Sequence, residues 1–364
     1  MNKNRVLVGM SGGVDSSAVA VMLKESGYEV IGVTITPFKI EDECRVKINE
    51  RSCCDYQAVI DAAKLCDKLG IEHYLMDRTG AFKAYVIDYF IDEYMNGRTP
   101  NPCVVCNPTI KWGEMLAKAE ALGAYYIATG HYAKLRRESG RITLSKGEDQ
   151  HKDQSYFLWR LTQDQLERTL FPLSDMVKSQ TRELLKERGI ETADKLESQE
   201  ICFVPENDYR SFLKKHSPEL STLPEGDIVY RGSVIGKHGG YPFYTVGQRR
   251  GLGVSHSEPL YVTRIDPEKN IIEVDVAERL GKKRLLAKKV NMIKYDDIPR
   301  EREFIVKIRY KDSGKPALCK INSDGDLEVE FMEPRDSITP GQSVVVYEGN
   351  DVVAGAVIDS SSYE

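Results

Sequence analysis

The sequence has no long hydrophobic run, no detectable internal repeat and no low-complexity tract. No apolar stretch approaches the length of a membrane span, and the apolar residues near the N-terminus are too few for a signal peptide, because a glycine-rich turn follows them directly. These absences predict a protein without a membrane anchor, and we expect it in the cytoplasm.

The chain also has little excess charge of either sign. Its 51 lysines and arginines face 56 aspartates and glutamates, which gives a formal net charge of −5. This balance argues against a protein that binds nucleic acid through its overall charge, although it allows a local basic surface. The 364 residues are too many for one ordinary hydrophobic core, so we expect two or three domains.

The chain has eight cysteines, and in a cytoplasmic protein they are thiols, metal ligands or catalysts rather than structural disulfides. Cys103 and Cys106 form a Cys-x-x-Cys pair in the segment 97–108, whose three prolines predict a stiff, irregular loop. Such a pair holds two thiols within reach of each other or of one metal ion. A zinc site would need a second Cys/His pair, and the spacing of Cys53 and Cys54 does not supply one.

The remaining cysteines carry weaker signals. Cys66 shares a helix face with apolar residues and Cys319 alternates within a strand pattern, so both are expected in the core. Cys202 stands between apolar residues, which by itself is typical of a core position. No role is predicted for the cysteines of one charged segment, Cys44, Cys53 and Cys54.

The most informative stretch is 11–17, which reads Ser-Gly-Gly-Val-Asp-Ser-Ser. An apolar run that ends at Met10 predicts a strand before it, and a helical pattern begins at Val14. Backbone N–H groups converge where a strand, a glycine-rich turn and a helix N-terminus meet, and the helix dipole favours an anion there. The carboxylate of Asp15 would repel a phosphate unless a Mg²⁺ lay between them. The stretch therefore predicts a site for nucleotide phosphates and a metal ion.

Other interpretations of this stretch are open. A Ser/Gly-rich turn can simply cap a helix. Residues 9–13 also fit the Gly-x-Ser-x-Gly pattern of α/β-hydrolases with Ser11 as nucleophile, but that turn normally follows several strands and would leave Asp15 without a role. No Gly-Lys-Ser/Thr follows, so this is not a Walker P-loop. The stretch is similar to the pyrophosphate loop of the N-type ATP pyrophosphatases, which implies that ATP adenylates a carbonyl oxygen with loss of pyrophosphate.

Strand and helix patterns alternate through the first part of the chain. Strands are predicted near 30–35, 71–76 and 124–129, and helices over 55–69, 81–95 and 110–122. Such alternation is typical of a parallel sheet with helices on both faces, whose ligands bind beyond the carboxyl ends of the strands. Ser11 and the pair 130–131 both fall at such ends, so we expect them to converge. The helix over 81–95 is expected to bury one face, made of Phe82, Tyr85, Val86, Tyr89 and Phe90.

Short, closely spaced strand patterns begin after about residue 205. They are predicted near 227–230, 233–235, 261–265, 271–276, 304–310, 317–321, 327–331, 343–347 and 352–358. This spacing predicts a small β module followed by a β-barrel. We therefore expect an α/β ATP-pyrophosphatase domain over 1–208, a small β-rich domain over 209–280 and a C-terminal β-barrel over 281–364.

A family resemblance extends over nearly the whole chain. Besides 9–16, it is carried by Gly-Arg-Thr-Pro-Asn-Pro (97–102), Cys-Asn (106–107), Ile-Lys (110–111), Ala-Thr-Gly-His-Tyr (128–132), Lys-Asp-Gln-Ser-Tyr-Phe (152–157), Ile-Cys-Phe (201–203), Tyr-Thr-Val-Gly-Gln-Arg-Arg-Gly-Leu-Gly (244–253) and Thr-Pro-Gly-Gln-Ser (339–343). Each piece alone is unspecific, whereas the combination is highly specific. On these motifs the chain resembles the tRNA-specific 2-thiouridylases, which make 2-thiouridine at the wobble position of tRNA.

The resemblance implies roles for these motifs. It implies contact of Asn101 and Pro102 with the target base. It implies ATP binding, with Mg²⁺ held beside Asp15, by Gly9, Met10, Ser11, Gly12, Gly13, Val14, Asp15, Ser16, Ile35 and Gly130. It implies that the partner is tRNA, contacted by Cys103, His131, Lys152, Asp153, Gln154, Arg309, Tyr310 and Gln342.

The resemblance also implies that Cys202 carries the sulfur as a persulfide and that Cys106 helps to release it. The chemistry agrees, because adenylation makes the uracil O2 a good leaving group and a sulfur nucleophile can then displace AMP from C2. One cysteine can bear the persulfide while the other resolves it as a disulfide. The sulfur would come from a relay protein, a cysteine desulfurase or free sulfide.

The chain departs from the common family pattern at Cys103, where many members have an aspartate that is taken as an acid/base group. Without that carboxylate, Cys103, Cys106 and Cys202 can be interpreted as a catalytic set of three thiolates that holds a 4Fe–4S cluster with one open iron. A Cys-x-x-Cys pair with one further cysteine supports cluster chemistry and persulfide chemistry equally.

Two basic surfaces are candidates for contact with tRNA phosphates. Arg249 and Arg250 lie close in sequence to aromatic residues, a mixture suited to phosphate contact and stacking. A second run lies over 282–289, and a solvated charged face explains it as well.

The sequence thus predicts an ATP-dependent tRNA sulfurtransferase. One alternative is another ATP pyrophosphatase, a ligase acting on a small acceptor, which would not need Cys106 and Cys202. The other is a module that binds tRNA or a metal without catalysis.

Overall fold

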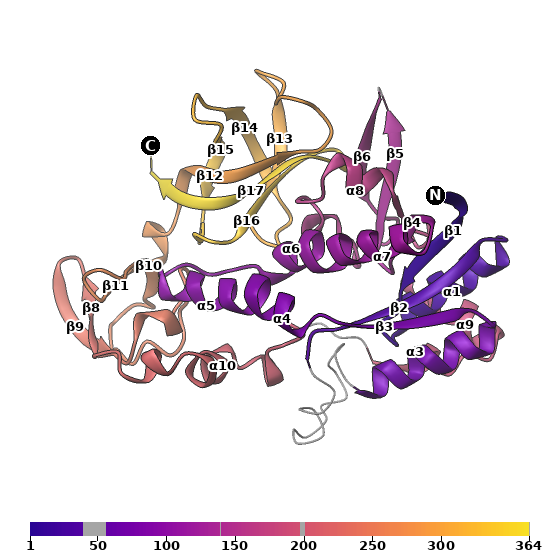
Figure 1. Ribbon diagram of the computed structural model, residues 1–364. Coiled ribbons are helices and arrows are strands. Elements are labelled where there is room, and N and C mark those ends of the chain that lie inside the picture. The colour runs from indigo at the N-terminus through magenta and orange to yellow at the C-terminus, as the bar shows by residue number, and fades with distance from the viewer. Residues whose placement is uncertain (39–55, 139, 197–200, 364) are drawn as a thin grey trace. The chain divides into compact units, whose positions relative to one another are not determined.

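The computed structural model describes residues 1–38, 56–138, 140–196 and 201–363 (Figure 1). It forms two compact units. The first comprises Met1–Val86, Cys103–Asn207 and Asn350–Val352, and the second comprises Ile87–Pro102, Asp208–Gly349 and Val353–Glu364. The division into three domains remains a prediction. In the described ranges, no helix combines the length and the apolar character needed to cross a membrane.

The first unit is built on a parallel sheet, as predicted. Its strands follow the order β3-β2-β1-β4-β7, and the neighbouring strands run parallel. Val6, Leu7 and Val8 of β1 are fully buried, which explains why this strand reads as a continuous apolar run. The strands are β1 (Asn2–Gly9), β2 (Glu29–Thr36), β3 (Glu72–Asp77), β4 (Ala124–Ala128) and β7 (Thr169–Leu170).

The first unit also contains helices. They include α1 (Val14–Glu25), α3 (Tyr56–Leu69), α4 (Thr79–Phe82), α7 (Met115–Ala121), α8 (Gln163–Glu167) and α9 (Lys178–Glu187). Most of α1 is buried in one cluster with Val6 and with Cys66 of α3. Cys66 is a core residue, as predicted, and burial raises the pKa of its thiol to about 12, so it stays protonated and inert.

The helix predicted over 81–95 is present, but a wider turn interrupts it. It consists of α4, the π-helix η1 (Lys83–Ile87) and α5 (Asp88–Met95). Phe82, Val86 and Phe90 are buried, as expected for an i, i+4 spacing. Tyr85 was placed on the same face but is 57% exposed, because the π turn adds a residue and rotates this side chain toward solvent.

The segment around Cys103 and Cys106 is helical, so the irregular loop predicted over 97–108 is wrong from Pro102 onward, whereas 98–101 are irregular as predicted. The helix α6 spans Pro102–Cys106, and the π-helix η2 (Asn107–Glu114) follows it directly. Pro102 is the first residue of α6, where a helix needs no N–H donor. Pro108 lies at the start of the wider π turn, where its missing N–H is tolerated.

The first unit also contains an antiparallel hairpin that the sequence patterns do not predict. The strand β5 (Ala133–Glu138) pairs with β6 (Arg141–Lys146) along its whole length. The sequence of β5 is Ala-Lys-Leu-Arg-Arg-Glu, in which charged residues interrupt the alternation of apolar and polar positions. The pattern that predicts a strand is therefore absent.

The second unit contains the small β module predicted from the strand patterns. Its sheet has the order β10-β11-β8-β9, and Ile228, Val262 and Ile272 are fully buried in its core. The helix α10 (Tyr209–His216) precedes this sheet. The strands are β8 (Gly226–Tyr230), β9 (Ser233–His238), β10 (Tyr261–Asp266) and β11 (Ile271–Asp275).

The strands β12 to β17 form a closed antiparallel barrel, as predicted (Figure 1). They follow the order β12-β15-β14-β13-β16-β17, and β17 pairs again with β12. Cys319 lies in the barrel core, as expected. The strands are β12 (Lys282–Met292), β13 (Glu303–Lys307), β14 (Lys315–Ile321), β15 (Leu327–Arg335), β16 (Ser343–Glu348) and β17 (Asp351–Ser362).

Candidate active site

The turn between β1 and α1 has the form expected of an anion-binding loop. Gly12 has a φ of 66°, and a Cβ at this position would lie 2.1 Å from the Ala58 carbonyl oxygen, so only glycine fits. Gly13 is the N-cap of α1, and among the described residues no side chain accepts a capping hydrogen bond there. The N–H groups of the first turn can therefore bind an anion at the positive end of the helix.

The serine hydroxyls of this loop bond to the loop itself. Ser16 Oγ lies 3.1 Å from Ser11 Oγ and 3.3 Å from the Gly13 carbonyl oxygen, to which it donates. Ser17 Oγ donates to the same carbonyl at 2.7 Å and accepts from Thr192 Oγ1 at 2.9 Å. Ser11 thus bonds to a serine, whereas the nucleophile of a hydrolase bonds to a histidine, and this argues against the hydrolase interpretation.

Asp15, in the first turn of α1, lies at the centre of a polar cluster. Its Oδ1 accepts from Lys178 Nζ at 2.6 Å and from the Tyr132 hydroxyl at 2.9 Å. The side chain of Lys178 is only 12% exposed, so this ion pair is largely shielded from water. Burial and the charge of Asp15 raise the pKa of Tyr132, which keeps the phenol protonated as a donor.

Sequence reasoning alone misses Lys178. Lys178 is the first residue of α9, where a cation opposes the helix dipole. This unfavourable position is the feature of the sequence that could have indicated a functional role. Its backbone N–H donates to Oδ2 of Asp149 at 3.0 Å. Oδ1 of the same buried carboxylate accepts from the N–H groups of His151 and Lys152 at 3.0 and 3.2 Å. Asp149 therefore fixes both the start of α9 and the turn that carries Lys152.

The end of β4 comes close to the same loop, as the sequence predicts. A Cβ on Gly130 would lie 2.7 Å from the Cβ of Asp15, so the two segments touch at a glycine. Ile35 is half-buried near the carboxyl end of β2, which pairs with β1. The residues predicted to bind ATP, in the loop 9–16 and at Ile35 and Gly130, are therefore gathered at one edge of the sheet. Their contact with ATP remains a prediction.

His131, predicted to contact tRNA, is buried in the first unit. Its Nδ1 lies 2.8 Å from Thr129 Oγ1. Burial, together with the charge of Lys111, lowers the pKa of His131 well below its usual value. The imidazole is therefore neutral at physiological pH.

The motif 152–157 forms a tight turn through its own side chains. The carboxylate of Asp153 accepts from the N–H and from the hydroxyl of Ser155, both at 3.0 Å. Gln154 Oε1 accepts from the N–H of Tyr132 at 3.1 Å. The turn thus shapes the backbone around Lys152, and contact of Lys152, Asp153 and Gln154 with tRNA remains a prediction.

Cys103 and Cys106 lie one helical turn apart on α6, so their side chains share a face. Both are half-buried, and so is Cys202. The ring of Phe203 packs edge-on against Phe82 with 5.6 Å between centroids, which anchors the segment that carries Cys202. Across the described residues, no group of three or more His, Cys, Asp or Glu side chains is placed to hold a metal ion. Cys103, Cys106 and Cys202 do not form such a group in the described residues, and a cluster held by them remains a prediction. The cysteines outside the described residues are Cys44, Cys53 and Cys54.

In the second unit, Gln342 holds the segment that precedes Asn101 and Pro102. Its Nε2 donates to the carbonyl oxygens of Thr99 and Pro100 at 3.0 and 3.1 Å. Gln342 was predicted to contact tRNA, and Asn101 and Pro102 were predicted to meet the target base. The structure gives Gln342 a positioning role for that segment, and its contact with tRNA remains a prediction.

Arg309 and Tyr310 lie in a turn after β13 that a buried ion pair fixes. Asp312 Oδ2 accepts from the N–H of Ile308 at 3.0 Å, and Nη2 of Arg335 lies 2.7 Å from both of its carboxylate oxygens. Arg309 is exposed and Tyr310 is half-buried, so both can meet a ligand from solvent.

The basic run over 282–289 is part of β12, and some of its charges are paired. Leu285 and Ala287 face the barrel core. Arg284 pairs with Glu330, and Lys288 pairs with Asp359. These pairs favour the interpretation of this run as the solvated face of a strand.

The parallel sheet, its glycine-rich turn and the closed barrel together define a class of protein, a nucleotide-binding α/β domain of the ATP-pyrophosphatase type joined to β-rich domains. Family models agree with this class. The tRNA methyl transferase HUP domain matches residues 4–206, the tRNA methyl transferase PRC-barrel domain matches 210–275, and the aminomethyltransferase beta-barrel domain matches 282–358.

Sequence identity to known proteins identifies one family within this class. The chain is 46% identical over 358 residues to tRNA-specific 2-thiouridylase MnmA 1 of Caldanaerobacter subterraneus, with 98% of both chains covered. It is 45% identical over 363 residues to tRNA-specific 2-thiouridylase MnmA of Pelotomaculum thermopropionicum, with 99% of both chains covered. The chain therefore belongs to the family of the tRNA-specific 2-thiouridylases. Among solved structures, the U34-tRNA thiolase NcsA from Methanococcus maripaludis with its 4Fe–4S cluster is 19% identical with a TM-score of 0.34, covering 61% of this chain and 68% of that chain.

Proposed function

We propose that this protein acts in the cytoplasm and uses ATP to replace O2 of the wobble uridine of tRNA with sulfur. One observation carries the proposal: the phosphate loop 9–16 shares a compact unit with Cys106 and Cys202. Thiolation needs an activated oxygen and a sulfur nucleophile, and these two features supply them. The names of the matching family models refer to methyl transfer, but an ATP-cleaving loop has no role in moving a methyl group to tRNA.

The first step is adenylation. ATP binds with its phosphates at the loop 9–16 and its adenosine against Ile35 and Gly130. The N–H groups of the first turn of α1 and the ammonium of Lys178 place positive charge where the phosphates are negative. The uracil O2 attacks the α-phosphorus and pyrophosphate leaves, which makes the oxygen on C2 a good leaving group.

A Mg²⁺ fits beside Asp15. The bonds from Lys178 and Tyr132 both reach Oδ1, which leaves Oδ2 to ligate a metal ion. When bound, the ion neutralises part of the phosphate charge. The chain itself supplies the orientation, because Asp149 fixes the backbone of Lys178 and Gly12 gives the loop its shape.

The second step is sulfur transfer, with Cys202 as the persulfide carrier. The terminal sulfur attacks C2, and AMP leaves with the former O2. The thiolate of Cys106 then attacks Sγ of Cys202, which releases 2-thiouridine and joins the two cysteines in a disulfide. A dithiol reductant restores both thiols. A relay protein or a cysteine desulfurase would deliver the persulfide sulfur, whereas free sulfide would attack C2 directly.

A cluster held by Cys103, Cys106 and Cys202 is the second candidate for the sulfur step. It requires three thiolates around one metal group, and the placement of side chains in the described part of the chain does not favour such a group. We therefore propose the persulfide route.

Mass spectrometry of tRNA nucleosides tests this function. With ATP, Mg²⁺ and a persulfide donor, the wild type should form 2-thiouridine, AMP and pyrophosphate, and only when tRNA is present. Cys202→Ser and Cys106→Ser should each abolish multiple turnover, because one loses the sulfur carrier and the other the resolving thiol. Both variants should still bind ATP.

Cys103→Ser is the matched control, because it removes a thiol from the same helix as Cys106. The persulfide route requires this variant to stay active. Loss of its activity, together with bound iron in an anaerobic wild-type preparation, would favour the cluster. Formation of AMP from a small acceptor without tRNA, retained when both Cys106 and Cys202 are serine, would instead identify a ligase.

A further inference from the structure

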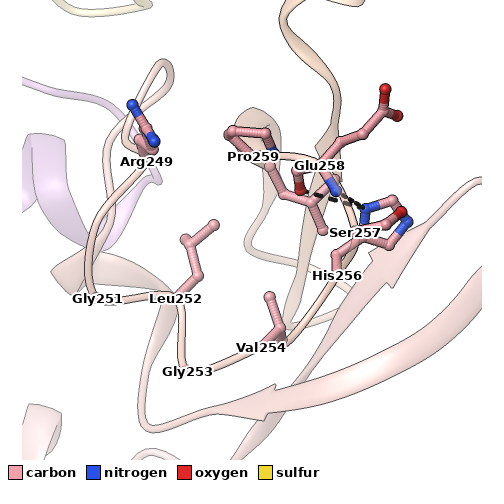
Figure 2. Close-up of a pocket in the computed structure, with 10 residues that line it drawn as sticks. Arg249, Gly251, Leu252, Gly253, Val254, His256, Ser257, Glu258 and Pro259 are labelled. Carbon is pink, nitrogen blue, oxygen red and sulfur yellow. Dashed lines mark hydrogen bonds between the residues drawn. The ribbon is translucent and has the colours of Figure 1, made fainter.

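One motif of the second unit, whose arginines are sequence candidates for phosphate contact, has no assigned place in the reaction described so far. Residues 248–254, which comprise the end of the motif 244–253 and the following Val254, carry Arg249 and Arg250 and are called the arginine loop below. Arg249 and residues 251–254 of this loop form one side of a hollow of about 380 Å³ in the protein surface (Figure 2). We propose that the arginine loop binds the phosphodiester backbone of the anticodon arm of tRNA, beside the target base. The proposal rests on the proposed function, since it takes tRNA as the substrate.

The stem of the arginine loop is fixed by hydrogen bonds. The N–H of Gly247 donates to the Val262 carbonyl at 2.7 Å, and the N–H of Val262 donates to the Gln248 carbonyl at 2.9 Å, which ties the stem to β10. The side chain of Gln248 closes the loop, because Nε2 donates to the Arg250 carbonyl at 2.9 Å and Oε1 accepts from the N–H of Thr245 at 3.2 Å. These bonds restrict the stem of the loop, which lowers the entropy lost on binding.

The stem also touches the segment predicted to meet the target base. Thr99 Oγ1 donates to Thr245 Oγ1 at 3.2 Å. Thr99 lies just before Asn101 in the chain, and Gln342 holds its carbonyl oxygen. The stem of the arginine loop is therefore hydrogen-bonded to the segment predicted to meet the target base, and both belong to the second compact unit. If Asn101 and Pro102 meet the target base, a surface at this place would face the nucleotides that flank it.

The charges of the loop are available to a ligand. Both arginines are exposed, and no carboxylate among the described residues pairs with either of them. Other cations of the same sheet are paired, such as Lys237 with Asp227 and Arg231 with Asp275. Because guanidinium groups bind phosphates through two parallel hydrogen bonds, an unpaired pair of arginines suits an RNA backbone.

The backbone of the loop adds further donors. Gly251 and Gly253 have φ values of 74° and 71°. In the part of the chain that the structure describes, none of the N–H groups from Arg249 to Val254 donates a hydrogen bond. Successive N–H groups of this kind form concave anion sites. Figure 2 shows that the carboxylate of Glu258, at the rim of the hollow, points away from the glycine turn.

The double variant Arg249→Gln/Arg250→Gln tests the proposal through the salt dependence of RNA binding. Loss of two phosphate contacts should weaken binding of an anticodon stem-loop by about tenfold or more. It should also reduce the slope of log affinity against log salt concentration by about 1.4. Fluorescence anisotropy over a series of KCl concentrations measures both quantities. The affinity for Mg·ATP and the melting temperature should equal those of the wild type.

Arg231→Gln/Lys237→Gln is the matched control, because it removes two charges from the same sheet that are already paired. Its slope should stay at the wild-type value. The proposal is wrong if the arginine-loop variant keeps the wild-type slope, if the control loses as much slope, or if only full-length tRNA and not the stem-loop reveals a difference. A wild type that binds tRNA but makes no 2-thiouridine would refute the sulfurtransferase function and leave this proposal open to the same binding test.

Discussion

At the scale of single residues, the phosphate loop brings opposite charges close together. Asp15 contributes one negative charge at the N-terminus of α1. Lys178 contributes one positive charge that offsets it, and the N-terminus of α1, which has no side-chain cap among the described residues, adds partial positive charge. The N-terminus of α9 adds none to this count, because Asp149 already accepts from its first N–H. The surplus is positive. A ligand with several negative charges, such as the triphosphate of ATP, therefore fits this place better than a neutral one.

The variant Lys178→Met tests this balance. It should weaken Mg·ATP binding by about tenfold to a hundredfold, because it removes a charge-assisted contact and leaves Asp15 unpaired near the phosphates. Adenosine should bind as it does to the wild type, since it has no phosphates. Titration calorimetry measures both affinities. Lys186→Met, in an exposed ion pair on the same helix, should change neither. Equal losses for ATP and adenosine would show that Lys178 only supports the fold.

At the scale of elements, buried carboxylates fix the turns that carry the predicted tRNA contacts. Asp149 holds the turn of Lys152, and Asp312 holds the turn of Arg309. Each carboxylate accepts backbone N–H groups and thereby replaces a partner that the turn itself does not supply. The predicted contact residue three positions away, half-buried Lys152 or exposed Arg309, thereby keeps a defined position.

Asp312→Asn should destabilise the barrel by about 3 kcal/mol at neutral pH, because Arg335 loses the partner of a buried ion pair. Burial alone would raise the pKa of Asp312, but the N–H of Ile308 and the guanidinium of Arg335 outweigh it and hold this pKa below its usual value. The stabilisation is therefore fully present above about pH 4 and is lost as the pH falls through the lower pKa of the folded state.

Urea unfolding at several pH values measures this effect. The difference between wild type and Asp312→Asn should shrink below pH 4. Glu328→Gln, which breaks the exposed pair with Lys320, is the control and should cost less than about 1 kcal/mol. An equal loss in the free energy of unfolding for both variants at neutral pH would show that burial does not strengthen the pair of Asp312 with Arg335.

At the scale of the whole molecule, the sequence predicts what local periodicity encodes and misses what long-range contacts create. The parallel sheet and the barrel were predicted, because buried strands read as apolar or alternating runs. The strand β12 was missed, because its lysines and arginines mask the inward positions of Leu285 and Ala287. The pair of Asp15 with Lys178 joins residues 163 positions apart, and no local pattern reports such a contact.

Predicted tRNA contacts occur in both units, which gives a prediction for the whole molecule. Lys152 belongs to the first unit and Arg309 to the second. Lys152→Ala and Arg309→Ala should each weaken tRNA binding, and the double variant should lose roughly the product of the two factors, because sites that share no contact partner contribute independently. ATP binding should not change. Filter binding at moderate salt measures the three variants, and an unchanged tRNA affinity of the double variant would contradict the predicted contacts.

Closure of the barrel removes the strand edges through which β-sheets aggregate. An open sheet ends in strands whose N–H and C=O groups are unpaired, and another chain can add to them. In the ring that the structure describes, β12 and β17 cover each other, and Leu286 lies opposite Ser360. These partners are far apart in the chain, so both edges stay open during synthesis until β17 has emerged from the ribosome. A chain truncated before β17 would therefore keep two unpaired strand edges. We expect such a chain to self-associate rather than to lose stability locally.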